Sequence, residues 1–283
     1  MNIAVVGLGL IGGSLAMTFR QHGHRVVGVD PDETTRNAAI AMHVADLCTE
    51  DLAAIGECEF VVLAAPLGVI VQVGRDAMKH LAKGAILVDA ASVKSEIVAA
   101  LDEAIPETAY FVGGHPMFGV ERRGISAARR DLVVGAPFVI TPTKKTASHA
   151  LDRVEGLFSS IGMRTMQMAP DEHDAKLATL SHLPQLLAIA LSLNAEDTRA
   201  AGPSFRGATR TAMSPPHMLS NIVDKNRVAL VNAVAQLHET LVGLLAAPPE
   251  TLEARLVQAR ERRLELEAVV PHGSPSTVRL DQK

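Results

Sequence analysis

The first 170 residues alternate short apolar runs with longer segments of helical character. The apolar runs are rich in β-branched residues and cover residues 3–6, 25–29, 60–63, 85–88, 110–112 and 138–140. The segments of helical character include 32–42, 69–81 and 94–104. Nearly continuous apolar strands that alternate with helices are typical of a parallel sheet covered on both faces. The pattern predicts an α/β, doubly wound (Rossmann-like) N-terminal domain.

Strand patterns stop after about Pro170, and helical periodicity takes over. The pattern predicts a long helix over 171–200 with Pro184 inside it, followed by helices over 203–212, 216–246 and 250–268. We therefore expect an α/β domain over 1–168, an all-α domain over 169–270, and a frayed polar tail over 271–283.

The predicted all-α domain carries more apolar side chains than about 100 residues bury easily in one small helical domain. In the segment 216–246 they recur at helical spacing, at Leu219, Ile222, Val223, Leu230, Val234, Leu237, Leu241 and Leu245. Burial between two subunits would cover this surface, so we expect a homodimer formed through the C-terminal helices.

Composition and charge exclude several classes of protein. The 283 residues include 27 Lys and Arg against 31 Asp and Glu, a net charge of -4, so the chain lacks the positive field of a nucleic-acid-binding protein. Cys48 and Cys58 form no CxxC pair, which favours a reducing compartment. Residues 3–19 are uncharged, but no basic segment precedes them and four glycines interrupt them. We expect a cytoplasmic protein without a membrane segment.

A GxGxxG motif, Gly7-Leu8-Gly9-Leu10-Ile11-Gly12, lies between the first predicted strand and a helix. Gly7 would permit the tight turn, Gly9 the approach of a pyrophosphate, and Gly12 close packing of helix on sheet. Leu10 and Ile11 open the helix, whose N-terminus favours an anion. This context predicts a dinucleotide-binding loop.

Asp30 ends the second predicted strand, 18 residues beyond Gly12, where a carboxylate can accept hydrogen bonds from the adenine ribose. Its charge would repel a 2'-phosphate, and no Arg or Lys follows until Arg36, so we expect NAD as cofactor in preference to NADP. The alternative is that Asp30 only caps the next helix. Ala65 and Pro66 follow the run 60–63 and are further candidates for cofactor contact, unless Pro66 only ends the strand.

Two more predicted strands end in polar residues that would face the same crevice. Ser92 and Lys94 follow the run 85–88, and His115 follows the run 110–112 between glycine and proline. A neutral histidine beside a nicotinamide can take a proton from an alcohol, because its usual pKa is near 6.5. The alternative for His115 is a structural role.

Five motifs together resemble the prephenate and arogenate dehydrogenase family, the cyclohexadienyl dehydrogenases of tyrosine biosynthesis. They begin at Gly7, Asp89, Gly114, Ser181 and Arg206, and they span about residues 3 to 227 in the family's order. The resemblance implies NAD-dependent oxidative decarboxylation of prephenate to 4-hydroxyphenylpyruvate, of arogenate to tyrosine, or of both. It implies hydride transfer from C4 of the substrate ring, with His115 as proton acceptor.

The resemblance also assigns roles around the ring. Ser92 matches a serine that hydrogen-bonds near the substrate hydroxyl and His115; its alternative role is a helix N-cap. Lys94 is expected to be a solvated charge or to lie near the helix cap. Arg210 matches the arginine that binds a substrate carboxylate, and Arg206, on the same helical face, ranks second. Either arginine could instead form a surface or interface ion pair.

His182 matches an active-site polar group, with helix packing as its alternative. His173 also matches a family position, but nine residues are about half a turn apart on an ideal helix. Both histidines can line one site only if the helix bends or a second subunit contributes.

Many members of the family have the sequence His-Leu-Pro-His where this chain has His-Leu-Pro-Gln, with Gln185 in the last position. Because an amide both donates and accepts, Gln185 leaves prephenate, arogenate and an amino analogue open.

A metal site and two alternative functions would each require features of their own in the sequence. The histidines lack an HExxH motif and the cysteines lack zinc-ligand spacing, so we expect no metal site. A β-hydroxyacid dehydrogenase would share the architecture but would use a lysine on the helical segment, where Lys176 is the candidate. A non-catalytic NAD(H)-sensing dimer would need a basic recognition helix, which the sequence lacks.

Overall fold

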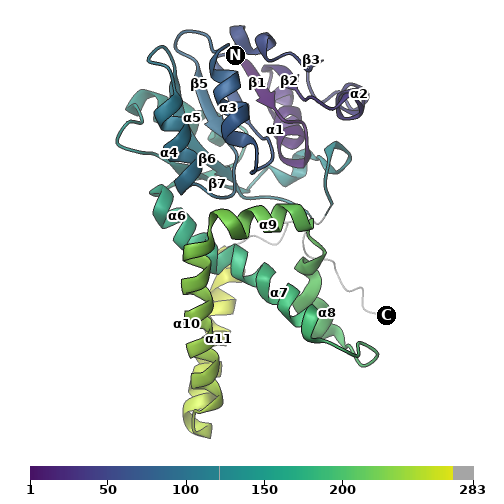
Figure 1. Ribbon diagram of the computed structural model, residues 1–283, viewed down its shortest axis with the longest axis vertical. Coiled ribbons are helices and arrows are strands. Elements are labelled where there is room, and N and C mark those ends of the chain that lie inside the picture. The colour runs from purple at the N-terminus through teal and green to yellow at the C-terminus, as the bar shows by residue number, and fades with distance from the viewer. Residues whose placement is uncertain (121, 270–283) are drawn as a thin grey trace. The chain divides into compact units, whose positions relative to one another are not determined.

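The computed structural model describes residues 1–120 and 122–269. Eight strands form one sheet in the order β3-β2-β1-β4-β5-β6-β7-β8, parallel except between β6 and β7 (Figure 1). Their bounds are β1 Asn2–Val6, β2 Arg25–Val29, β3 Leu47–Thr49, β4 Phe60–Leu63, β5 Ile86–Asp89, β6 Tyr110–Pro116, β7 Pro137–Thr141 and β8 Arg164–Gln167. The predicted α/β class is confirmed. The short edge strands β3 and β8 were not predicted, because neither forms a buried apolar run.

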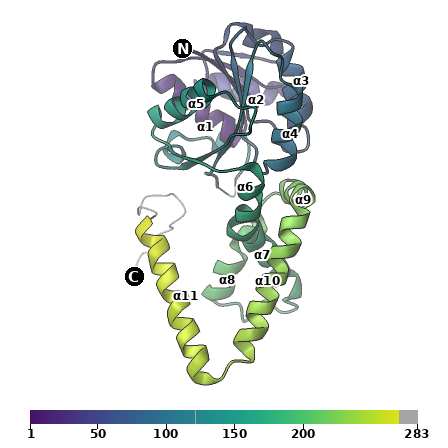
Figure 2. The ribbon, with the colours of Figure 1, turned by 90° about the vertical axis from the view of Figure 1, so that its left-hand side faces the viewer.

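Helices cover both faces of the sheet. The helices α1 (Leu10–Gln21), α2 (Glu33–Ala41) and α5 (Ser148–Ser160) pack into one hydrophobic cluster, and α3 (Ile70–Met78) and α4 (Ser95–Ala104) pack into the other (Figure 2). Alternate strand residues supply the two clusters: Ile3 and Val5 face one side, and Ala4 and Val6 face the other. The uncharged run 3–19 is therefore a core strand and a core helix.

The helices beyond the sheet are more broken than the sequence suggests. The expected single helix over 171–200 is α6 (Pro170–Leu177), a π-helical turn (Ala178–His182) and α7 (Leu183–Asn194). Pro184, in the first turn of α7, has no N–H to donate to the preceding turn, which accounts for the interruption.

Two further helical predictions are corrected in the same way. The predicted helix over 203–212 is α8 (Pro203–Thr209) followed by a 3-10 turn (Arg210–Met213). The predicted helix over 216–246 is two helices, α9 (Pro216–Lys225) and α10 (Arg227–Leu245). Asn226 separates them with the non-helical dihedral angles φ -118° and ψ 26°, and its side-chain amide donates to Asp174 O on α6. Hydropathy alone does not show such a break, because Asn226 lies within an otherwise helical pattern.

The chain divides into two compact units, Met1–Arg227 and Val228–Lys283. Within the second, α10 and α11 (Pro249–Val269) are joined by a short turn and run in opposite directions (Figure 2). They expose many apolar side chains, among them Val231, Val234, Leu241, Val242, Leu245, Leu256, Val257 and Leu264. The predicted domain boundary at 168/169 stays a prediction, and the predicted frayed tail, 271–283, lies outside the described residues.

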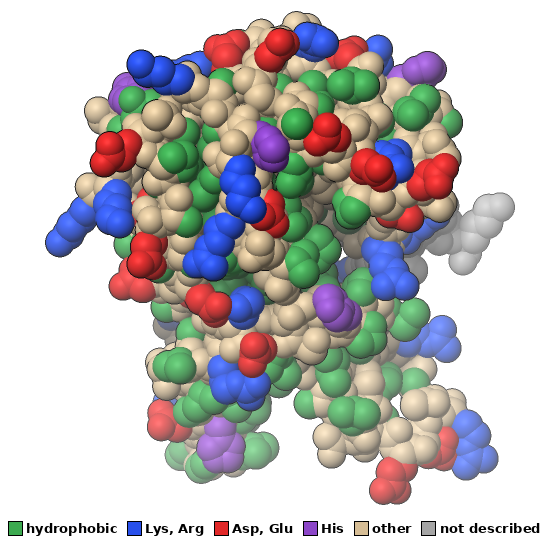
Figure 3. Space-filling model, turned by 45° about the horizontal axis from the view of Figure 1, so that its top comes forward, with side chains coloured by type: hydrophobic (Ala, Val, Ile, Leu, Met, Phe, Trp, Pro, Cys, Tyr) green, Lys and Arg blue, Asp and Glu red, His purple; other side chains and the backbone are tan. Residues whose placement is uncertain are grey.

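Two helical stretches, Pro170–Asn194 and Arg227–Leu245, are long and apolar enough to cross a membrane by length and composition alone. Core and interface helices pass the same test. On the face in Figure 3, acidic and basic side chains are interspersed, and no broad basic patch covers it. This face gives no support for nucleic-acid binding.

A buried ion pair fixes the ends of β5 and β6 against each other. Lys94 and Asp89 are both fully buried, and the Lys94 ammonium donates to the Asp89 carboxylate and to Gly114 O, at 2.6 Å from the latter. The Asp89 carboxylate also accepts from Gly114 N at 3.1 Å. The expectation that Lys94 is solvated is wrong, whereas its expected place in the capping region is confirmed, because Lys94 is the N-cap residue of α4. Burial lowers the pKa of Lys94, and Asp89 opposes that shift.

Replacing Lys94 with methionine would leave the Asp89 carboxylate buried without its cation. We expect Lys94→Met to lower the free energy of unfolding by about 3–5 kcal/mol, as when one partner of a buried pair is removed. Urea unfolding of the full chain measures the change. Lys176→Met is the matched control, because Lys176 pairs with Glu172 on the surface, and it should change stability little. Similar losses in the two variants would contradict this role of the buried pair.

Candidate active site

In the glycine-rich loop, neighbouring backbone atoms leave no room for a side chain at two glycines, whereas a third glycine faces open space. Gly7 has φ +96°, and a Cβ there would lie 2.6 Å from Ala64 O. A Cβ on Gly12 would lie 1.8 Å from Gly7 O. At Gly9, in contrast, a Cβ would meet nothing within 4 Å. Packing therefore explains Gly7 and Gly12, whereas Gly9 borders open space in front of the loop.

The open space lies at the N-terminus of α1. Gly9 is the N-cap residue, and no described side chain caps the helix, so the first turn with Leu10 and Ile11 presents backbone N–H groups. Ala65, half-buried, and Pro66, exposed, follow the neighbouring strand β4. The arrangement fits a pyrophosphate on the helix N-terminus.

Asp30 follows β2 and supports the loop. Its carboxylate accepts from Leu8 N at 2.8 Å and from Asp32 N at 3.0 Å. The alternative role of Asp30 as cap of α2 is wrong, because Asp32 caps that helix by accepting from Thr35 N at 2.8 Å. Each Asp30 oxygen has further lone pairs, so the carboxylate can still accept from a ribose hydroxyl.

Arg36 lies beside Asp30 and is already engaged. Its guanidinium donates to Asp30 O at 2.9 Å and to Pro31 O at 2.8 Å. The same group lies 3.3 Å from a carboxylate oxygen of Glu50. These contacts use several of the donors that a 2'-phosphate would require.

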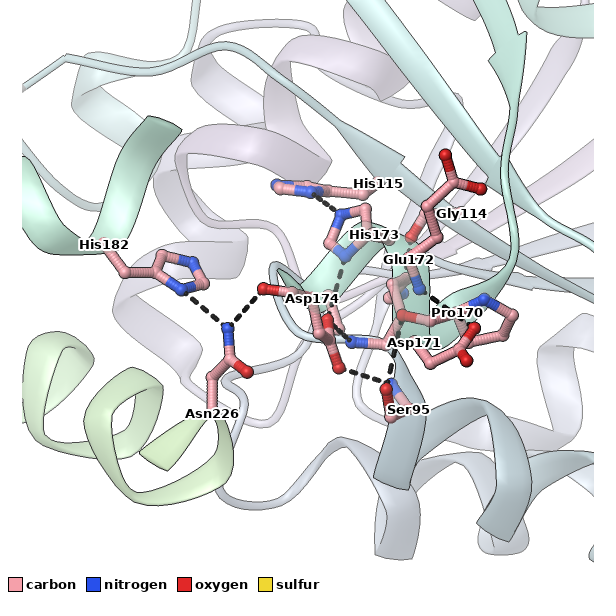
Figure 4. Close-up of polar contacts among 12 residues, drawn as sticks. Ser95, Gly114, His115, Pro170, Asp171, Glu172, His173, Asp174, His182 and Asn226 are labelled. Atoms are coloured by element: carbon pink, nitrogen blue, oxygen red, sulfur yellow. Dashed lines mark hydrogen bonds and ion pairs between the residues drawn. The ribbon is translucent and has the colours of Figure 1, made fainter. Parts of the chain in front are cut away.

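His115 lies near the carboxyl end of β6, beyond the last residue of that strand that pairs with β5. Its side chain is buried, and its Nδ1 lies 2.8 Å from Nε2 of His173. The Nδ1 of His173 lies 2.9 Å from the Asp174 carboxylate (Figure 4). The three side chains thus form a hydrogen-bonded series from β6 to α6.

The carboxylate of Asp174 also caps α4. It accepts from Lys94 N and Ser95 N, each at 2.8 Å. The alternative role of Ser92 as the side-chain cap of this helix is therefore wrong. Ser92 is half-buried, and its hydroxyl makes no hydrogen bond to the described residues. Its contact with His115 and the substrate stays a prediction.

His182 joins the same network through Asn226. The Asn226 amide lies 3.1 Å from His182 Nδ1 and donates to Asp174 O at 2.9 Å (Figure 4). His173 and His182 thus meet in one network within one chain, because the π-helical turn Ala178–His182 changes the course of the helix between them. Helical periodicity gave no signal for Asp174 or Asn226.

Burial keeps His115 and His182 from gaining charge. The pKa of His115 is lowered well below 6.5, first by burial and then by His173, Lys94 and His182. Burial also lowers the pKa of His182, to about 4. For Asp174 burial acts upward, but hydrogen bonds from His173 and the backbone of Ser95 and Lys94 outweigh it, so its pKa is lowered. At neutral pH His115 is therefore neutral, and Asp174, on the other side of His173, is ionised.

The remaining predicted site residues lie outside the hydrogen bonds of this network. Arg206, on α8, and Arg210, in the turn after it, have exposed side chains. Gln185, on α7, has a buried Oε1 that accepts no hydrogen bond from the described residues. Their roles toward a substrate stay predictions. Among the described residues, no group of three or more His, Cys, Asp or Glu could hold a metal ion.

Two family descriptions match the chain. "Prephenate dehydrogenase, nucleotide-binding domain" matches residues 15–167, and "Prephenate dehydrogenase, dimerization domain" matches residues 169–261. Between them they cover most of the chain, including His115 and the helices that carry His173 and His182.

Individual relatives agree. The chain is 30% identical to the prephenate dehydrogenase of Bacillus subtilis over 80% of this chain, but it spans only 64% of that protein's length. It is 29% identical to the cyclohexadienyl dehydrogenase of Zymomonas mobilis over 94% of this chain and 96% of that protein. The crystal structure of A. aeolicus prephenate dehydrogenase in complex with hydroxyphenyl propionate and NAD+ has a TM-score of 0.86 at 28% identity, covering 94% of this chain and 98% of that one. The chain therefore belongs to the prephenate dehydrogenase family.

Proposed function

We propose that this protein catalyses the NAD-dependent oxidative decarboxylation of prephenate, arogenate or both. The observation that carries the proposal is His115: a buried histidine with a lowered pKa, on a strand that ends at the same edge of the sheet as the glycine-rich loop. The names of the relatives, which include prephenate and cyclohexadienyl dehydrogenases, supply the substrate class.

His115 moves one proton in this reaction. NAD, held by the loop Gly7–Gly12, would supply the acceptor for the hydride that leaves C4 of the substrate ring. His115 Nε2 takes the proton of the C4 hydroxyl as the C4 carbonyl forms. The bond between C1 and its carboxylate then breaks, carbon dioxide leaves, and the bonding electrons make the ring aromatic. His115 returns its proton to the C4 oxygen, so the product is a phenol and no net proton is consumed.

Residues of the helical segment, together with Ser92 after β5, would bind the polar substituents of the substrate. Arg210 would bind a substrate carboxylate with its bidentate guanidinium, with Arg206 as the second candidate. Ser92 would contact the hydroxyl near His115. His182 and Gln185 would lie toward the three-carbon side chain, whose keto or amino group distinguishes prephenate from arogenate. The buried Oε1 of Gln185, which accepts no hydrogen bond from the part of the chain that the structure describes, supports a polar partner there.

The cofactor preference follows from the end of β2. Asp30 would accept the ribose hydroxyls and repel a 2'-phosphate. Arg36, whose guanidinium is bonded to two backbone carbonyls and lies beside Glu50, would offset little of that repulsion. NAD is therefore the preferred cofactor, with the loop Gly7–Gly12, Ala65 and Pro66 around it.

The assembly proposed is a homodimer through the C-terminal helices. The family match to a dimerization domain and the exposed apolar side chains of α10 and α11 support it. A cytoplasmic location stays a prediction. The β-hydroxyacid dehydrogenase alternative loses support, because Lys176 is exposed and paired with Glu172 at 2.6 Å.

The direct test supplies NAD or NADP with prephenate and with arogenate in separate assays and follows the absorbance of the reduced cofactor. We expect NAD to be reduced with at least one of the two substrates, with a higher kcat/KM than with NADP. The ratio of kcat/KM for the two substrates gives the side-chain preference. Absence of turnover with both substrates and both cofactors would contradict the proposed function.

His115→Asn removes the base and keeps a polar side chain of similar size. We expect kcat to fall by about 10²- to 10⁴-fold with little change in the Kd of NADH. Because the pKa of His115 lies below 6.5, the wild-type kcat/KM should stay level from about pH 8 down past about pH 6.5 and decline only below that. An acid limb at or above about pH 6.5, or full activity in the variant, would remove His115 from this role.

Gly9→Ala tests where the cofactor lies. The added Cβ has open space and an allowed φ of -70°, so the fold should tolerate it, but it would intrude where the pyrophosphate is expected. We expect the Kd of NADH to rise at least about tenfold with an unchanged Tm. Gly12→Ala is the contrasting variant, because its Cβ would collide with Gly7 O and lower the Tm. Unchanged NADH affinity in Gly9→Ala would show that the cofactor binds elsewhere.

A further inference from the structure

We propose that Asp174 and His173 are positioning residues that hold His115 with its proton on Nδ1, so that Nε2 is the base. The inference rests on the proposed function for its catalytic consequence, but the tautomer itself can be measured without turnover. We call the series Asp174–His173–His115 the relay.

The first step concerns Asp174. Two backbone N–H groups, of Lys94 and Ser95, donate to its two carboxylate oxygens at 2.8 Å each, and Nδ1 of His173 lies 2.9 Å from one of these oxygens. A carboxylate that receives backbone donors on both oxygens is ionised, in agreement with its lowered pKa, and has no proton to give. The nitrogen of His173 that faces it must therefore carry the proton.

The second step concerns His173. An imidazole whose single proton is on Nδ1 has a lone pair on Nε2, and Nε2 of His173 lies 2.8 Å from Nδ1 of His115. Only one of two nitrogens in a hydrogen bond donates, so Nδ1 of His115 carries the proton. The other ring nitrogen, Nε2, points away from the network in Figure 4 and keeps its lone pair for the substrate hydroxyl.

The third step separates the relay from a purely structural role. Capping of α4 requires an acceptor for Lys94 N and Ser95 N, and Asp174 alone would provide it. Capping does not require His173, which is fully buried and spans the distance from that carboxylate to His115. When His115 gains its proton, the positive charge that forms lies one imidazole away from an ionised carboxylate, which stabilises it.

The primary experiment measures the tautomer of His115 in the wild-type full chain with NADH bound. The 15N chemical shifts of labelled histidine distinguish a protonated from an unprotonated ring nitrogen, and the His115→Asn spectrum assigns the signals. We expect His115 to be neutral at neutral pH with its proton on Nδ1. A proton on Nε2 of neutral His115 would overturn the inference, and this measurement needs no active variant.

Two variants test the consequence for turnover. His173→Phe removes the link while filling its volume, and Asp174→Asn removes the charge while leaving an amide that can present either end to His173. We expect kcat to fall by about 10- to 100-fold in each, as for other outer partners of a functional histidine, with KM and the Kd of NADH within about twofold. The His115 tautomer should no longer be fixed.

Glu172→Gln is the matched control, because Glu172 precedes His173 on the same helix, but among the described side chains its carboxylate pairs with exposed Lys176 and not with the relay. It should keep the wild-type kcat and tautomer. A folded His173→Phe variant with unchanged kcat and an unchanged His115 tautomer would overturn the relay. If wild-type protein turns over neither prephenate nor arogenate, the proposed function fails, and the tautomer measurement still decides whether Asp174 and His173 position His115.

Discussion

The carboxyl edge of the sheet presents backbone N–H groups that neither the strands nor the helices can pair, and three carboxylates satisfy them. Asp30 accepts from Leu8 N and Asp32 N. Asp89 accepts from Ala91 N and Gly114 N, and Asp174 accepts from Lys94 N and Ser95 N. Orphan N–H groups at buried helix starts must find acceptors. The same need makes the uncapped start of α1 suitable for a pyrophosphate.

Asp174 differs from the other two carboxylates because it comes from beyond the sheet. It belongs to α6, which follows the last strand, and it brings His173 against His115 as it caps α4. Asn226, at the end of α9, binds Asp174 O and His182, so the helical segment contributes to the network at three points. The network around His115 is therefore complete only with residues from helices that follow the sheet in the chain.

Sequence patterns predicted the sheet, the glycine-rich loop and His115, because each depends on local chemistry: apolar runs, a tight turn, and a polar residue at a strand end. They did not predict what depends on long-range contact. Lys94 reads as a surface charge beside a helix start, and only its pairing with Asp89 shows why it is buried. Asp174 lies within an ordinary helical pattern, and its partners are about 80 residues earlier in the chain. Asn226 interrupts a helix, and its side chain contacts His182 and Asp174 O, which lie 44 and 52 residues earlier in the chain.

The burial that leaves His115 neutral and able to accept a proton also makes the fold sensitive to acid. In the unfolded chain a histidine takes up a proton near pH 6.5. In the folded protein His182 does so only near pH 4, and His115 likewise well below 6.5. Between these values the unfolded chain binds protons that the native protein excludes, so proton linkage shifts the equilibrium toward unfolding as the pH falls from about 6.5 toward 4. Acid unfolding and a ready proton acceptor at neutral pH are thus two results of the same desolvation.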